Sequence, residues 1–208
     1  ALYFYPALSG SLLLTERDLS VFFIPPRHLW VEAIKAGEFP LWNPYTYGGH
    51  PLLATLQPGV LYPVNALLLL LPFDLAFNWT IIVHFFLSGV FTYLLLRDLK
   101  ASKTGSLIGA LVFMLSGYLF SSHNLISTLF SVTWAPLVIM LYRRAVRQDS
   151  YLYGAITGIS LAVMFLGGGI EVLFGTLLFL TFYTLMPSIL RFESSHDNEP
   201  LLIKRSCL

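Results

Sequence analysis

The sequence predicts an all-α, polytopic transmembrane helix bundle of about six helices, the first one incomplete, with an extracytoplasmic loop that contains interfacial amphipathic helices. Composition is the first reason, because 56% of the 208 residues are hydrophobic and only 11% are charged, about half the usual charged share. The second reason is the recurrence of apolar runs long enough to cross a bilayer. A soluble domain of this length has too little interior to bury so much apolar surface, so the predicted medium is lipid.

Five apolar runs fit the roughly 20 residues that a membrane-spanning helix needs. Charged residues separate them, since Arg97 and Lys100 follow the first run and Arg143 and Arg144 follow the third. The fourth and fifth runs meet at three consecutive glycines. The predicted spans are about 77–96, 104–121, 125–142, 151–167 and 171–190.

The two ends of the chain differ from these spans. Residues 1–14 are apolar but too short to cross a bilayer, and no charged region leads them. We therefore expect an incomplete first helix there rather than a signal peptide. Residues 191–208 are predicted to form a polar cytoplasmic tail, which leaves residues 1–190 as one transmembrane module with a long loop at 15–76.

The distribution of Lys and Arg predicts the orientation, because these residues favour the cytoplasmic ends of spans. The short connections at 121–124 and 167–170 contain none of them. The loop 15–76 is therefore predicted to be extracytoplasmic, with the amino and carboxyl termini both in the cytoplasm. The cations on the predicted cytoplasmic side are Arg97, Lys100, Lys103, Arg143, Arg144, Arg147, Arg191, Lys204 and Arg205.

The long loop carries its own helix signals. Thr15 and Asp18 have the spacing of a capping box at the start of a helix. A second helix is expected from Pro26 to Ala36, where Pro suits the first turn and Gly37 suits the cap. This helix is amphipathic and can lie flat on the bilayer surface. A further apolar helix over 60–71 is too short to span.

The composition of the chain argues against several classes of function. A net charge of +1 provides no basic face for nucleic acid, so no nucleic-acid partner is expected. The single cysteine, Cys207, cannot form an internal disulfide. No spacing of His, Cys, Asp and Glu indicates a metal site, and no cofactor is predicted.

A set of loop motifs resembles the first extracytoplasmic loop of the YfhO-like bacterial membrane proteins. The motifs are GEFPLWNP at 37–44, GGHP at 48–51, QPG at 57–59 and LYPVN at 61–65. Further similarity lies in SGY at 116–118, in His123 and in WAPL at 134–137, so that the resemblance covers roughly residues 12–175.

This family is similar to the GT-C class of glycosyltransferases, and the resemblance implies a multi-pass protein of the bacterial inner membrane. Such enzymes transfer a sugar from a polyprenyl-phosphate donor to an acceptor outside the cytoplasm. In that class an acidic motif follows the first helix, and Glu16-Arg17-Asp18 occupies that place here. By resemblance Asp18 is the candidate catalytic base, with Glu16 beside it.

Transfer from a lipid phosphate also requires a cation near the leaving phosphate, for which Arg17, Arg27 and Lys35 are candidates. Aromatic rings offer flat faces and hydrogen-bonding edges to sugar or prenyl groups, for which Trp42 and Tyr45 are candidates. His50 and His123 lie within the motifs that resemble the family and complete this part of the substrate-binding set.

Two further polar residues fall within predicted spans. His84 lies inside the 77–96 run, and Glu171 opens the last run near the outer face. A charge in or near hydrocarbon is costly, so it indicates either function or a partner on a neighbouring helix. Glu171 is therefore included among the substrate-binding candidates, with interhelical hydrogen bonding as the alternative for both residues.

Each candidate also has a plainer interpretation. Asp18 can form a helix capping box with Thr15. The side chains of Arg27 and Lys35 can extend along the membrane interface so that their charged ends reach water. Trp42 and Tyr45 are explained as interfacial anchors.

Members of the family continue with further membrane helices beyond the region that this chain resembles. The alternative function is therefore a non-catalytic integral membrane subunit, derived from such a protein, that packs against membrane lipids and partner membrane subunits.

Overall fold

The computed structural model describes residues 13–15 and 17–197, with side chains described as far as Met186. Glu16, most of the predicted incomplete first helix and residues 198–208 of the predicted tail lie outside the described residues. The described chain is mostly helical. The all-α part of the prediction is therefore confirmed, apart from one small hairpin in the loop.

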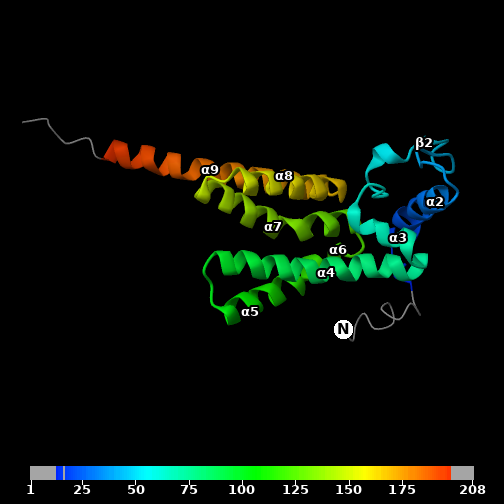
Figure 1. The fold of residues 1–208 in the computed structure, drawn as a ribbon, viewed down its shortest axis with the longest axis horizontal. Coiled ribbons are helices and arrows are strands. Elements are labelled where there is room, and N and C mark those ends of the chain that lie inside the picture. Colours follow the sequence, from blue (N-terminus) through cyan, green and yellow to red (C-terminus); the bar gives the residue numbers. More distant parts are fainter. Residues whose placement is uncertain (1–12, 16, 198–208) are drawn as a thin grey trace, which may run out of the picture.

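Figure 1 shows the order of the elements along the chain. A π-helical turn η1 (Leu19–Phe23) leads directly into α2 (Ile24–Lys35). The loop continues with strands β1 (Trp42–Asn43) and β2 (His50–Pro51), the turns η2 (Leu53–Thr55) and η3 (Pro63–Ala66), and α3 (Leu67–Leu70). The bundle follows as α4 (Phe73–Asp98), α5 (Lys103–Met114), α6 (Gly117–Ser122), α7 (Ile126–Gln148), α8 (Tyr151–Leu166) and α9 (Ile170–Asp197).

Within the described residues, three helical segments are long and apolar enough to cross a membrane, namely α4, the α5–α6 segment Lys103–Ser122, and α7. This finding supports a membrane protein. The predicted runs at 151–167 and 171–190 also coincide with helices, but the apolar parts of α8 and α9 are shorter. The run at 104–121 is interrupted, because Ser116 begins a new helix by accepting a hydrogen bond from the Leu119 amide with its hydroxyl.

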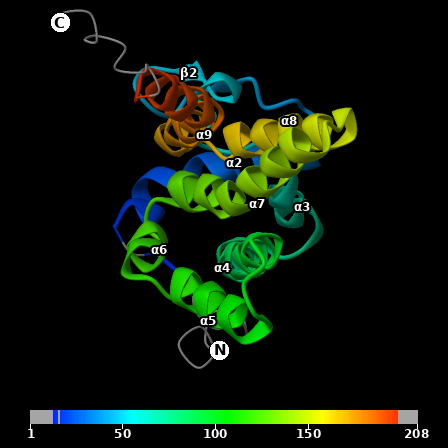
Figure 2. The same cartoon turned by 90° about the vertical axis from the view of Figure 1, so that its left-hand side faces the viewer.

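The helices pack in successive layers, in the order α5, α4, α7 and then α8 with α9 (Figures 1 and 2). Helix α7 lies at the centre of this arrangement and contributes Ile126, Leu129, Phe130 and Val138 to the core. Large apolar side chains on the outer faces of α5, α8 and α9 remain exposed, as expected for helices that contact lipid.

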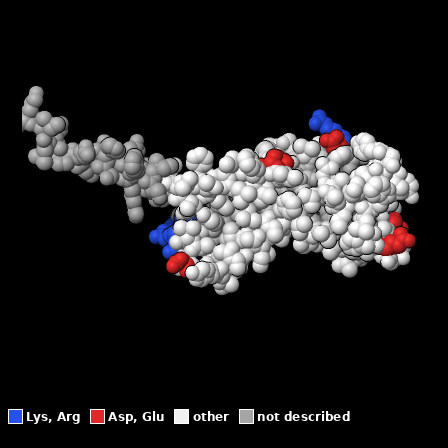
Figure 3. All heavy atoms as spheres, turned by 90° about the horizontal axis from the view of Figure 1, so that it is seen from above, with Lys and Arg blue, Asp and Glu red and all other residues white. Residues whose placement is uncertain are grey.

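The two ends of the bundle differ in charge. At the end away from the loop, Asp98 of α4 accepts hydrogen bonds from Arg143 Nε at 3.0 Å and from Arg144 Nε at 2.7 Å. Figure 3 shows charged side chains at both ends of the molecule and a few acidic and basic groups along one edge between them, on a surface that is otherwise uncharged. We call the end with these arginines the arginine end.

The turn between α8 and α9 packs directly against α7. The Ser131 hydroxyl donates to the Met164 carbonyl and accepts a hydrogen bond from the Gly169 amide, both at 2.9 Å. A Cβ atom at Gly169 would lie 2.7 Å from the Ser127 carbonyl oxygen and 2.8 Å from Ser131 Oγ. Glycine is therefore required for this close approach.

The substitution Gly169→Ala is expected to lower the free energy of unfolding by about 1–3 kcal/mol, because the added methyl group would push α9 away from α7. Thermal unfolding in detergent, followed by intrinsic fluorescence, measures the change. Gly158→Ala is the matched control, since nothing lies within 4 Å of a Cβ atom at that position. Equal melting temperatures for the two variants would show that the turn does not pack as described.

Candidate functional site

A pocket of about 450 Å³ lies in the loop, between the η1–α2 segment and the hairpin formed by β1 and β2. We call it the loop pocket. One wall is apolar and comes mainly from Val21, Phe22, Pro25 and Leu29. The opposite wall is polar but uncharged and comes mainly from Asn43, Tyr45, Thr46, Tyr47, His50 and Gln57.

Hydrogen bonds within the hairpin hold the polar wall in place. Asn43 pairs with His50 across the two antiparallel strands. Its side-chain oxygen accepts from the Tyr45 amide at 2.9 Å, and its side-chain nitrogen donates to Thr46 Oγ1 at 3.0 Å. Thr46 Oγ1 also lies 3.2 Å from His50 Nδ1. A positive φ of 102° at Gly49 closes the turn and lets Trp42 lie against its backbone.

The two tyrosines of the polar wall are largely free to meet a ligand. Tyr45 is 81% exposed and Tyr47 is 90% exposed, and the ring of Tyr47 meets that of His50 edge-on with centroids 6.1 Å apart. Aromatic faces beside uncharged hydrogen-bonding groups suit a ligand that has both hydroxyl groups and apolar faces.

Asp18 does not line the loop pocket, although it lies only three residues before Val21 of the apolar wall. It occupies the N-cap position of η1, is exposed and makes no capping hydrogen bond with its side chain. Phe22, four residues later, lines the pocket, so the chain connects Asp18 directly to the apolar wall. The neighbouring Arg17 is also exposed, and its carbonyl accepts a hydrogen bond from Ser20 Oγ at 3.0 Å.

Arg27 faces the bundle core instead. Its side chain is only 1% exposed, and its Nη1 atom donates to the Phe23 carbonyl at 3.1 Å. The guanidinium lies over the rings of Phe23 and Phe130, at 5.3 and 5.9 Å from their centroids. Burial lowers the pKa of Arg27 to about 9, so the group keeps its positive charge at neutral pH.

The third candidate cation, Lys35, lies on the exposed side of α2. Its ammonium pairs with the Glu32 carboxylate at 3.5 Å. Both side chains are half exposed, so this ion pair contributes little to stability.

A chain of hydrogen bonds joins the loop to two bundle helices. Trp134 Nε1 of α7 donates to the Tyr62 hydroxyl at 2.8 Å, and this hydroxyl lies 2.5 Å from His84 Nε2 of α4. His84 Nδ1 contacts the Thr80 carbonyl, which can only accept, so Nδ1 carries the proton. Nε2 of the neutral ring therefore accepts a hydrogen bond from the Tyr62 hydroxyl. The hydrogen bonds are thus continuous from Trp134 through Tyr62 and His84 to Thr80.

Phe130 of α7 packs against this chain of hydrogen bonds. Its ring is stacked on His84 at 4.0 Å and on Tyr62 at 4.9 Å between centroids. Since Arg27 lies over the same ring, α2, the loop, α4 and α7 meet at one point. Burial raises the pKa of Tyr62, so this hydroxyl remains protonated at neutral pH. We call Arg27, Tyr62, His84, Phe130 and Trp134 the anchor cluster.

The remaining predicted residues do not line the loop pocket. Trp42 is exposed on the hairpin, and His123 of the α6–α7 connection is half buried with its Nδ1 atom against the Phe120 carbonyl. Glu171 accepts a hydrogen bond from Thr128 Oγ1 at 2.6 Å and lines a separate surface hollow. Of the predicted substrate-binding set, only Tyr45 and His50 therefore line the loop pocket.

The sequence interpretation missed other residues that contribute to these two regions. Asn43, Thr46, Tyr47 and Gln57 line the loop pocket, and Tyr62 and Trp134 complete the anchor cluster. The polar and turn-forming residues over 43–50 were the available signal for Asn43, Thr46 and Tyr47. For Tyr62 and Trp134 the sequence offered no such signal, because their contact with each other forms only when the chain folds.

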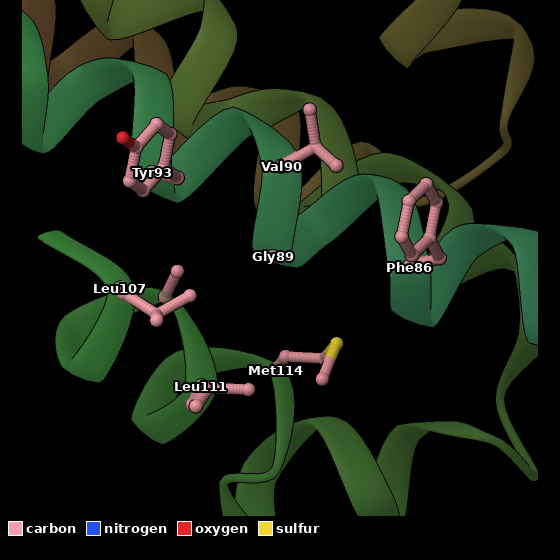
Figure 4. Close-up of a pocket in the computed structure, with 8 residues that line it drawn as sticks. Phe86, Gly89, Val90, Tyr93, Leu107, Leu111 and Met114 are labelled. Atoms are coloured by element: carbon pink, nitrogen blue, oxygen red, sulfur yellow. The ribbon is translucent and has the colours of Figure 1, made fainter. Parts of the chain in front are cut away.

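A different cavity, of about 310 Å³, lies between α4 and α5 (Figure 4). Phe86, Val90 and Tyr93 line it from α4, and Leu107, Leu111 and Met114 line it from α5 or its end. This surface is almost wholly apolar, so it can hold a hydrocarbon chain but offers little for chemistry.

No family model matches the chain, and no curated protein or solved structure matches it. Within the described part of the chain, no group of three His, Cys, Asp or Glu residues is placed to hold a metal ion.

Replacing Tyr62 with Phe is expected to lower the free energy of unfolding by about 1–3 kcal/mol, because Trp134 Nε1 and His84 Nε2 both lose their partner in a buried place. Thermal unfolding in detergent measures this loss. Tyr47→Phe removes the same atom from a side chain that is 90% exposed and should leave the melting temperature unchanged. A small effect of both substitutions would argue against a structural role for the Tyr62 hydroxyl.

Proposed function

We propose that the chain is a GT-C-like membrane glycosyltransferase, or the amino-terminal half of one, that transfers a sugar from a polyprenyl-phosphate donor on the extracytoplasmic side. The observation that carries the proposal is the loop pocket, which combines an apolar wall with an uncharged polar wall and whose apolar wall begins three residues after Asp18. In this proposal the chain crosses the inner membrane several times through α4, α5–α6, α7, α8 and α9, with both termini in the cytoplasm.

The lining of the loop pocket supports a sugar as the ligand. Sugars have apolar ring faces that stack on aromatic side chains and hydroxyl groups that need uncharged hydrogen-bonding partners. Tyr45 and Tyr47 supply the aromatic faces, whereas Asn43, His50 and Gln57 supply donors and acceptors. The apolar wall on η1 and α2 suits the first isoprene units of the carrier lipid.

The proposed reaction is a direct displacement at the anomeric carbon. Asp18 takes the proton from the acceptor hydroxyl while the oxygen of that hydroxyl forms a bond to the anomeric carbon. The bond between the anomeric carbon and the lipid phosphate breaks at the same time, and both of its electrons go to the phosphate. Arg17 is exposed beside Asp18 and is the proposed cation for the leaving phosphate. Arg27 is buried in the anchor cluster, so in this proposal it supports the wall of the pocket from behind.

The arginine end supports the proposed orientation. Arg143 and Arg144 pair with Asp98 there, and Arg97 and Lys100 lie at the same end of α4. Positive charge at one end of the spans favours the cytoplasm for that end. The loop pocket would then face the opposite, extracytoplasmic side.

The alternative is a non-catalytic subunit of a larger membrane complex. A hollow of about 550 Å³ between α8 and α9 is bordered by Gly154, Gly158 and Thr181. Neither glycine has any atom within 4 Å of the place where a Cβ atom would lie. Small residues beside an open groove allow the backbone of another helix to approach closely, which favours a partner at this face.

Asp18→Asn is expected to reduce sugar transfer by a factor of about 10²–10⁴, because the amide cannot accept the proton. The measurement is transfer of radiolabelled sugar from polyprenyl-phosphate donors in membranes that contain the chain. Asp74→Asn is the control, since Asp74 is also an exposed carboxylate and lies in the first turn of α4. Normal transfer by Asp18→Asn would remove this residue from the mechanism, and absence of transfer by the native chain would favour the subunit.

Tyr45→Ala is expected to raise the KM for the sugar donor by about tenfold, because it removes one aromatic face from the loop pocket. Its kcat should change less, since the ring contacts the ligand rather than the proton in transfer. Tyr151→Ala, at a fully exposed tyrosine near the arginine end, is the matched control. An unchanged KM in Tyr45→Ala would place the donor elsewhere.

A further inference from the structure

One long stretch of the loop carries no formal charge. From Phe39 to Phe73 the chain contains no Asp, Glu, Lys or Arg, whereas Glu38 precedes this stretch and Asp74 follows it. A water-exposed loop of this length normally contains charged residues, because they keep its surface hydrated. The composition therefore indicates that the segment lies in a medium other than bulk water.

Several large apolar side chains of this uncharged segment are nevertheless exposed in the structure, although others, such as Tyr62, are buried. Leu41 is 59% exposed, Trp42 is 56% exposed and Leu70 is 77% exposed, in addition to the two tyrosines of the hairpin. Soluble surfaces rarely expose large apolar patches without a partner. The mixture of Trp and Tyr with Leu is the mixture found where protein meets lipid headgroups.

The position of the hairpin along the molecule agrees with this composition. In Figure 1 β2 lies at the same level along the long axis as the first turn of α4. Helix α4 is long and apolar enough to cross a membrane, and its first turn contains Asp74. A spanning helix passes from headgroups into hydrocarbon at its first turns, so the hairpin lies level with the headgroup layer.

We propose that the hairpin 42–51 and helix α3 are seated in the headgroup layer of the bilayer, with Leu41, Tyr47 and Leu70 in contact with lipid. The partner of this surface is thus the lipid bilayer itself. Helix α3 adjoins α4 directly, so the seated surface is continuous with the lipid-facing surface of a spanning helix. A ligand would then reach the loop pocket from the lipid surface. The inference requires a membrane protein but not the transfer reaction.

Site-directed spin labelling tests this inference in the full chain reconstituted into phosphatidylcholine and phosphatidylglycerol liposomes. The only cysteine is Cys207, so Cys207→Ser provides a background for single labels. Labels are placed at Tyr47→Cys and Leu70→Cys, because both side chains are largely exposed. Lys35→Cys, on the charged side of α2, is the control. Collision rates with oxygen, which prefers lipid, and with a nickel chelate, which prefers water, are then measured.

We expect the ratio of oxygen to nickel collisions at positions 47 and 70 to exceed that at position 35 by several-fold. A ratio at position 47 equal to that at position 35 would place the hairpin in water and overturn the proposal. Low collision rates with both reagents at position 47 would also overturn it, because the surface would then be covered by protein. Circular dichroism of each labelled chain confirms that the helices remain formed.

Discussion

The hydrogen-bond chain from Trp134 through Tyr62 to His84 determines where the loop lies on the bundle. A hydrophobic contact between the same elements would allow the loop to slide, because apolar packing has little directional preference. Hydrogen bonds have direction, and a buried polar group that loses its partner carries a substantial free-energy penalty. Within helices that contact lipid there is little water to replace a lost partner. Tyr62 is therefore held in one place relative to α4 and α7.

The rest of the loop is built outward from this anchor. Tyr62 is close in sequence to Gly59 and Asn65, and the Asn65 side chain donates to the Gly59 carbonyl at 2.8 Å. Trp30 Nε1 donates to the neighbouring Pro58 carbonyl at 3.2 Å, which attaches α2 to the same stretch. Since α2 and Pro58 both border the loop pocket, the shape of the pocket depends on contacts made on the far side of α2.

The sequence predicted features that depend on local pattern and missed those that depend on contacts between distant segments. Apolar runs and their flanking charges located the bundle helices, because hydropathy along a single helix is a local property. For His84 the alternative was interhelical hydrogen bonding, but its side chain bonds to the loop residue Tyr62 and to Thr80 of its own helix, and it reaches Trp134 of α7 only through Tyr62. The burial of Arg27 was not predictable, because a snorkelling and a buried arginine have the same sequence pattern. The loop pocket was missed for a related reason, since Phe22 and Tyr47 meet only after the loop folds back.

The arrangement of charge around the loop pocket has a physical reason under the proposed place of the pocket beside a membrane. Hydroxyl, amide and imidazole groups can be removed from water at modest cost when a ligand supplies hydrogen bonds, whereas a buried carboxylate requires a charged partner. The lining of the loop pocket contains only uncharged groups, and Asp18 lies outside it at an exposed helix end. Under the proposed function this separation lets the pocket bind an uncharged sugar ring while the acid meets the acceptor at the rim. An acid within the lining would instead raise the cost of closing the pocket around its ligand.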